Sequence, residues 1–192
     1  MHPFKHFWTI TRHRHKVLVN CFKCHLFRQG LTHDLSKYSL SEFIPGAKYY
    51  VGTKSPNEPE RQENGYSLAW MHHKGRNKHH FEYWNDISPV SKRYESVVMP
   101  VRYVAEMFCD RIAASKIYKG KAYKDTDPRD YFQNGHARPN MNPVTADLLE
   151  SWLVILADQG EKTAFRTVRK ALKEDKIHRR EEKRRKKTVK GG

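Results

Sequence analysis

The chain has few cysteines, a shortage of acidic residues and no long apolar run. Three cysteines in 192 residues cannot all pair with one another, which argues against a disulfide scaffold and suits a reducing compartment. No apolar stretch approaches the roughly 20 residues that a membrane-spanning helix needs. Residues 1–10 also lack the hydrophobic segment of a signal peptide. The sequence therefore predicts a cytoplasmic protein with no membrane partner.

The hydrophobic share is low at 38%, but it is sufficient for a core. Four Trp, nine Phe and ten Tyr supply large apolar side chains, which excludes disorder of the whole chain. The length fits one domain of ordinary size with a short appendage. We expect a helical domain over residues 1–175 and a separate tail over residues 176–192.

The shortage of acidic residues leaves a strongly positive chain, with 37 basic against 21 acidic residues and a net charge of +16. The segment from Lys176 to Gly192 alone holds nine basic residues and two glutamates. Because this tail has almost nothing apolar to bury, we expect it to be disordered or frayed, or to extend the last helix. The charge indicates anionic partners: a phosphate-bearing small molecule, or nucleic acid bound non-specifically through the tail.

The spacing of apolar residues predicts an all-α protein with about six helices and no strand of useful length. Gly30 is expected to cap the first helix, Ser39 and Glu42 have the spacing of a capping box, and Pro100 suits a helix start. Residues 53–65 are expected to form a surface loop, and residues 120–143 to be rich in loops with one short turn near 129–132. The expected helices are Thr11–Arg28, Ser39–Tyr50, Tyr66–Trp84 with a break at Gly75, Pro100–Lys119, Val144–Asp158 and Glu161–Lys176.

The strongest local signal is the pentapeptide His33-Asp34-Leu35-Ser36-Lys37. An adjacent imidazole and carboxylate suit Mn, Fe, Co, Ni or Zn. Lys37 follows Asp34 by three residues and could meet a metal-bound phosphate as a point charge. The alternative is that His33 and Asp34 make ordinary hydrogen bonds at a helix start.

A second cluster lies in residues 70–84, where four histidines stand among cations with Trp at both ends. A buried imidazole needs a metal or a hydrogen-bond partner, so a turn could bring His72 or His73 together with His79 or His80. The alternative is a basic surface segment that binds anions without a metal. The residues of this cluster expected to bind a phosphate substrate are Lys74, Arg76 and Asn77.

A third feature is the position of Asp110 in the helix that Pro100 opens. A carboxylate directed at the core costs roughly several kcal/mol unless it is paired or binds a metal. A structural ion pair with a cation of another helix is the alternative to a metal ligand. The residues on the same helical stripe as Asp110 are Tyr103, Met107, Ala114 and Ile117.

The first predicted helix carries two further candidates. Either His13 or His15 can point inward from it. Residues 21–25 (CFKCH) fit the C-x-x-C-H pattern of covalent haem attachment, but they lie in a helical stretch without an export signal, so we expect no haem. A structural zinc site would need a second C-x-x-C pair, which the sequence lacks.

In chain order these features form H…HD…H…H…D, which resembles the HD-domain superfamily of metal-dependent phosphohydrolases. HDLSKYSLSEF, WMHHKGRNKHHFEYW and EMFCD are similar to an uncharacterised family of bacteria and phages thought to be HD-like. The resemblance covers most of residues 5–170 and excludes the tail.

This resemblance implies an HD-domain-like helical bundle with one or two divalent ions. Asp34 and Lys37 would be the catalytic residues, and Lys37 would also contact the phosphate of a nucleotide or another phosphate ester. Two alternatives stay open: a non-catalytic nucleic-acid-binding protein with a basic tail, and a di-iron HD-like oxygenase. The implied metal ligands are His13, His33, Asp34 and Asp110 for one ion, and His73 and His79 for the other, with Asp34 placed to bridge them.

Overall fold

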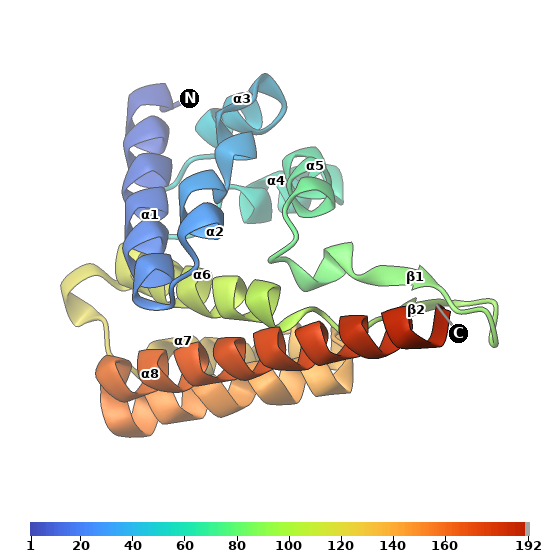
Figure 1. Cartoon of the computed structure of the whole chain (residues 1–192). Helices are drawn as coiled ribbons and strands as arrows, with labels where there is room; N and C mark the ends of the chain where they lie inside the picture. Colours follow the sequence, from blue (N-terminus) through green and yellow to red (C-terminus); the bar gives the residue numbers. More distant parts are fainter. Residues whose placement is uncertain (191–192) are drawn as a thin grey trace.

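The computed structural model describes the backbone of residues 1–190 and the side chains of residues 1–187. Within these residues the protein is an all-α bundle of eight helices with one small antiparallel sheet (Figure 1). The elements are α1 (Pro3–Lys23), α2 (Phe27–Thr32), α3 (Leu40–Lys48), α4 (Asn57–Asn64), α5 (Leu68–Arg76), β1 (Asn85–Ile87), β2 (Tyr94–Ser96), α6 (Val101–Lys119), α7 (Asp127–Asn134) and α8 (Pro143–Lys190).

Helix α6 lies at the centre of the molecule, between the layer of α1 to α5 and the layer of α7 and α8 (Figure 1). Phe108 of α6 is fully buried, and its ring packs edge-on against Trp152 and Phe165 of α8 at centroid distances of 6.1 and 5.7 Å. Full burial of each such ring stabilises the fold by about 1.5–3 kcal/mol. This apolar contact anchors α6, whose other side faces α1.

The long helix α8 reverses direction at Gly160, whose φ of 76° lies in the left-handed region that favours glycine. Its two halves, 143–159 and 161–190, therefore run back along each other (Figure 1). The prediction of two helices separated by Gly160 is confirmed. Of the two forms expected for the tail, the structure has the extension of the last helix, up to Lys190.

The first helix differs from the prediction at both ends. It starts at Pro3, and it ends at Lys23 because the chain turns at His25, which has a φ of 61°. Gly30 caps no long helix; it is buried within α2, where an added Cβ would lie 2.9 Å from Cys21 Cβ. Glycine thus lets α2 approach α1 closely, and this approach positions the residues that follow α2.

Other boundaries also differ from the prediction, while the helix after Pro100 is confirmed. The expected loop 53–65 contains α4, and the segment 120–143 contains the two-turn helix α7. The helix expected over 66–84 with a break at Gly75 is α5 alone, which passes through Gly75 and ends at Arg76; only a short 3-10 turn over Phe81–Tyr83 follows before Trp84. The unpredicted hairpin has strands of three residues each, too short for an alternating pattern to show.

The three cysteines are free and buried where α1 packs on α6, with 3.8 Å between the sulfur atoms of Cys24 and Cys109. Within residues 1–190, every helix is too short or too polar to cross a membrane.

Candidate metal centre

The turn after α2 directs the side chains of His33 and Asp34 into the protein. Asp34 has a φ of 52° and a ψ of 27°, a left-handed conformation that Asp tolerates better than most residues. Arg14 fixes the turn, because its Nε donates to the His33 carbonyl oxygen at 2.8 Å and its guanidinium also donates to the Leu31 carbonyl at 3.1 Å. The Asp34 side chain makes no helix-capping hydrogen bond, so the helix-start alternative is not what the structure has.

One group of donor atoms lies between α1, the His33 turn and α6. His13 Nε2 is 2.9 Å from Asp110 Oδ1, and His33 Nε2 is 3.7 Å from the same oxygen. Asp34 Oδ2 closes the group at 3.3 Å from His33 Nε2 and 3.9 Å from His13 Nε2. His13 is buried whereas His15 is exposed, so the structure brings His13 to the cluster.

A second group lies on the other side of Asp34. Asp34 Oδ1 is 3.3 Å from His73 Nε2 on α5 and 3.4 Å from His79 Nε2 in the turn that follows. His80 joins this group, and the ring centroids of His79 and His80 are 4.1 Å apart. The sequence did not decide between His79 and His80 as a ligand, and in the structure both belong to this group.

The two groups have the dimensions of metal sites. In each group of four residues, one ligand atom per residue lies within 4.8 Å of every other. Ligands on opposite sides of an ion at about 2.1 Å would be about 4.2 Å apart, so separations of this order are compatible with coordination of one ion by each group. Most of the inward atoms are buried, and several of them lack a hydrogen-bond partner: the Nε2 atoms of His73, His79 and His80, and Oδ1 of Asp34.

Two buried glutamates hold the opposite nitrogens of these histidines. Glu106 of α6 lies 2.9 Å from His33 Nδ1 and 3.3 Å from His79 Nδ1. Glu42 of α3 lies 2.7 Å from His73 Nδ1. A carboxylate on the far nitrogen fixes the tautomer and the orientation of a ligating imidazole. His33, His79 and Glu106 also lie close enough together to hold an ion. Their proximity is explained by the contacts of the two Nδ1 atoms with the Glu106 carboxylate.

The electrostatics of the cluster favour the metal-binding forms of Asp34 and His80 and the protonated form of His33. Burial opposes ionisation of Asp34, yet His33 and Lys37 hold the pKa of Asp34 well below its usual range. Burial, followed by the charge of His79, lowers the pKa of His80 well below its ordinary value, so this imidazole is neutral. Burial opposes protonation of His33, but Asp34 and its neighbours raise the pKa of His33 well above the ordinary value. Metal binding would therefore release a proton from His33.

Residues 2–155 match the model of a protein family described as "Family of unknown function (DUF5662)". The chain belongs to this family. No curated protein and no solved structure matches the chain. The family match includes every residue of both donor groups and ends within the first half of α8.

The side chains of the centre that reach solvent in this DUF5662 chain include those of Lys37 and Asp110. Their side chains are 29% and 18% exposed, whereas His33 and Asp34 are almost completely buried. Lys37 Nζ lies 2.7 Å from Asp34 Oδ2, so a phosphate that reaches Asp34 from solvent would pass this ammonium group. The role of Lys37 in binding phosphate stays a prediction.

The other three residues predicted to bind substrate lie at the end of α5, in different surroundings. Asn77 Nδ2 donates to Ser36 Oγ at 2.9 Å and to the His73 carbonyl oxygen at 2.8 Å, so its amide holds α5 to the turn after Asp34. Lys74 is half-buried within electrostatic reach of Glu82, and Arg76 is exposed. The role of Lys74, Arg76 and Asn77 in binding substrate stays a prediction.

Sequence reasoning did not find the roles of Glu42 and Glu106. The spacing of Ser39 and Glu42 predicts a capping box, but the Ser39 side chain makes no capping hydrogen bond to α3. The Glu42 carboxylate instead contacts His72 and His73. Glu106 precedes Asp110 by four residues and so shares its helical face. That spacing was the available signal for Glu106.

The contact between Glu42 and His73 carries a prediction. We expect Glu42→Gln to weaken the binding of the ion on the His73 side by about 10- to 100-fold, because an amide orients the imidazole less well than a carboxylate. Competition with a chromophoric chelator measures this affinity. Glu58→Gln, at an exposed position of α4, is the matched control and should change nothing. Unaltered affinity in Glu42→Gln would show that this carboxylate does not support a ligand.

Proposed function

We propose that this protein is an HD-type metal-dependent phosphohydrolase that holds up to two divalent ions of Mn, Fe, Co, Ni or Zn. One observation carries the proposal: the two oxygens of one buried carboxylate face separate donor groups. Asp34 Oδ2 faces His13 and His33, and Oδ1 faces His73 and His79. Two-metal phosphohydrolysis requires two ions about 3.5–4 Å apart, a separation that a bridging carboxylate can span.

The donor set fits such ions on chemical grounds. Imidazole nitrogens and carboxylate oxygens suit first-row transition metals, and an ion would satisfy the buried Nε2 atoms of His73, His79 and His80, which lack a hydrogen-bond partner. A bound divalent ion supplies Lewis acidity and lowers the pKa of water from 15.7 toward about 7.

The residues of the chain complete the chemistry. Asp34 fixes the separation of the two groups, and Glu106 keeps the Nε2 atoms of His33 and His79 directed inward by holding their Nδ1 atoms. The partly exposed Lys37 ammonium group can bind a phosphoryl oxygen and offset the negative charge that builds there during water attack. Burial of the remaining donors excludes bulk water, which strengthens these interactions.

The proposed substrates are nucleotides and related phosphomonoesters or diesters, a class favoured by the net charge of +16. Non-specific nucleic-acid binding through residues 176–192 stays a prediction, and so does a cytoplasmic location, which the three free thiols suit. Nucleic-acid binding would be supported by an affinity for DNA that falls steeply with added salt and is lost when residues 176–192 are deleted.

The proposed function is tested by elemental analysis and phosphate release on the full chain. Gently purified protein should contain transition metal and release phosphate from some member of a nucleotide and phosphodiester panel. Chelation should abolish release, and added metal should restore it. The variant His13→Ala should lose the ion of its own donor group and most of the activity, whereas His15→Ala, at an exposed position on the same helix, should keep both ions and the activity.

The outcomes separate the alternatives. Folded protein that binds no metal after reconstitution but binds DNA in a salt-dependent way would favour the nucleic-acid-binding protein. Iron-loaded protein that consumes oxygen and releases no phosphate would favour the di-iron oxygenase. Either result would overturn the hydrolase.

A further inference from the structure

A second candidate binding site lies outside the metal centre, in a hollow between α1 and the C-terminal end of α6. Its volume is about 350 Å³, and it opens to solvent. The hollow contains no proposed metal ligand, although His13 and Asp110 lie on the same two helices. Its lining consists of Arg12, Lys16, Lys116, Gly120, Lys121 and Tyr123.

Four cationic residues line this hollow, and most of them have no acidic partner. Arg12 and Lys16 are one helical turn apart and so lie on the same face of α1. Lys116 pairs with Glu161 and also lies over the ring of Tyr123, 5.1 Å from its centroid. Among residues 1–187 the structure shows no ion pair for Arg12, Lys16 or Lys121, which leaves three positive charges uncompensated at one concavity.

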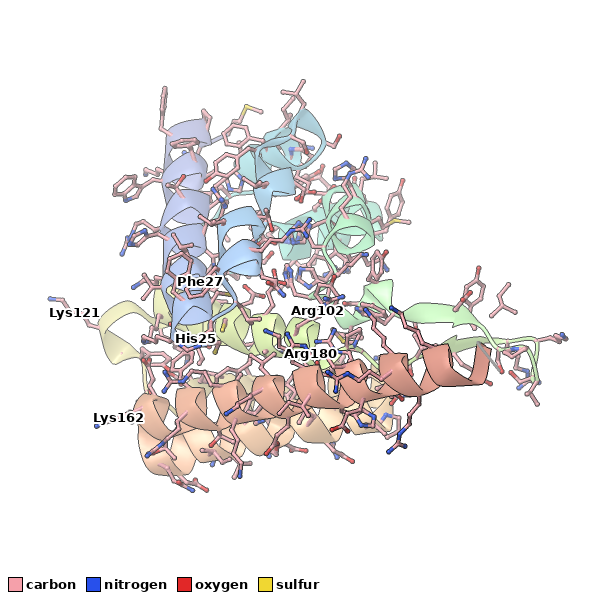
Figure 2. All side chains as sticks on the ribbon, viewed as in Figure 1. His25, Phe27, Arg102, Lys121, Lys162 and Arg180 are labelled. Atoms are coloured by element: carbon pink, nitrogen blue, oxygen red, sulfur yellow. The ribbon has the colours of Figure 1, made fainter. Side chains whose placement is uncertain are left out.

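The side chains come from separate elements and surround the space from more than one direction. Lys121 belongs to a short 3-10 turn over Gly120–Ala122, directly after α6. Figure 2 shows the Lys121 side chain extended away from the ribbon, and the residue is exposed, so it is free to rotate toward a ligand. A concave surface lined by charges of one sign concentrates counter-ions of the opposite sign.

The charge arrangement selects a class of ligand. Cations spread over two helices and a turn match several linked anionic groups better than one carboxylate. Arg12 can bind phosphate oxygens through two parallel hydrogen bonds, and the lysines act as point charges. The volume is at the lower end of small-molecule sites, and Tyr123 is its one aromatic wall.

We propose that this hollow binds a linear chain of two or more phosphate groups. The site does not depend on the metal centre being a hydrolase. The phosphate chain has two sources: the distal phosphates of a nucleoside polyphosphate that reacts at the metal centre, or a separate effector such as inorganic polyphosphate.

The test is calorimetric titration of inorganic triphosphate into full-length, metal-stripped protein. We expect binding that the double variant Arg12→Ala/Lys121→Ala weakens by at least about tenfold, since it removes two charge-assisted contacts. Both residues are exposed, so the fold should tolerate the change. The matched control is Arg166→Ala/Lys170→Ala on the exposed surface of α8, which should leave the affinity within about twofold of wild type.

Three results would overturn the proposal: equal affinity in the Arg12/Lys121 variant, equal loss in the control variant, or binding that needs added metal. Kinetics then separate the two sources. A substrate contact raises KM for a nucleoside triphosphate in the Arg12/Lys121 variant and leaves a monophosphate unaffected. A separate effector site leaves both KM values unchanged while triphosphate binding is lost. If the protein hydrolyses no substrate, the proposed function is overturned, but the binding of inorganic triphosphate to the hollow is tested independently by the titration.

Discussion

Replacing Asp34 with Asn is expected to remove every bound metal ion and to lower phosphate release by about three orders of magnitude. Asp34 is the one carboxylate shared by both groups of four donors, with an oxygen directed into each. Asn keeps the shape and tolerates the left-handed backbone at this position, so the turn itself should survive. Elemental analysis and phosphate release measure the two effects.

The control for this substitution is Asp86→Asn, at an exposed position of β1, which should retain metal and activity. Circular dichroism of the Asp34 variant should show unchanged helix content, because Lys37 is partly exposed and can move toward water when its partner is lost. A folded Asp34→Asn protein that retains both ions would remove Asp34 from the bridging position.

The helical class of the fold was predictable because the signals are local. Pro100 marks the start of α6, and Gly160 separates the two halves of α8, since each residue restricts or frees the backbone by its own covalent structure. The end of α1 was not predictable in the same way. His25 adopts a positive φ there because α2 packs back on α1, a tertiary effect that no local pattern announces.

The candidate centre was predictable to the extent that its residues stand out in composition. An HD pair, a His-rich segment and a carboxylate on an apolar stripe each break a pattern, and the fold brings all three together. Glu42 and Glu106 break no pattern, because glutamate is common on helices and a capping box explained Glu42 equally well. Their roles depend on the packing of α3 and α6 against the histidines, which only three-dimensional structure provides.

The structure also explains why these groups tolerate burial together. Burial opposes ionisation of Asp34 and Asp110. The histidines beside them nevertheless hold the pKa of both carboxyl groups well below the usual range. Both carboxylates thus depend in part on His33, whose Nδ1 is held by Glu106. A change at one donor is expected to affect the metal affinity of its own group first, and this allows the two groups to be separated by mutation.

Asp110→Asn is expected to remove one ion and to leave the other. Asp110 belongs only to the group with His13 and His33, whereas the group around His73 does not include it. Elemental analysis should therefore give one ion per chain instead of two, and phosphate release should fall by about two orders of magnitude because the second ion no longer stabilises the developing charge. Asp86→Asn is again the matched control.

Thermal melting of the Asp110 variant decides between a metal ligand and a structural ion pair. At a free metal concentration about one hundred times Kd, one site stabilises the fold by about 2.7 kcal/mol, which is about 5–10 °C in Tm for a chain of this size. A ligand role predicts that the variant loses the gain of one site with metal present and differs little from wild type after chelation. A structural partner predicts a loss of about 3–5 kcal/mol in both conditions. Because His13 Nε2, the closest contact of Asp110, is itself a proposed ligand, we expect the metal-dependent loss.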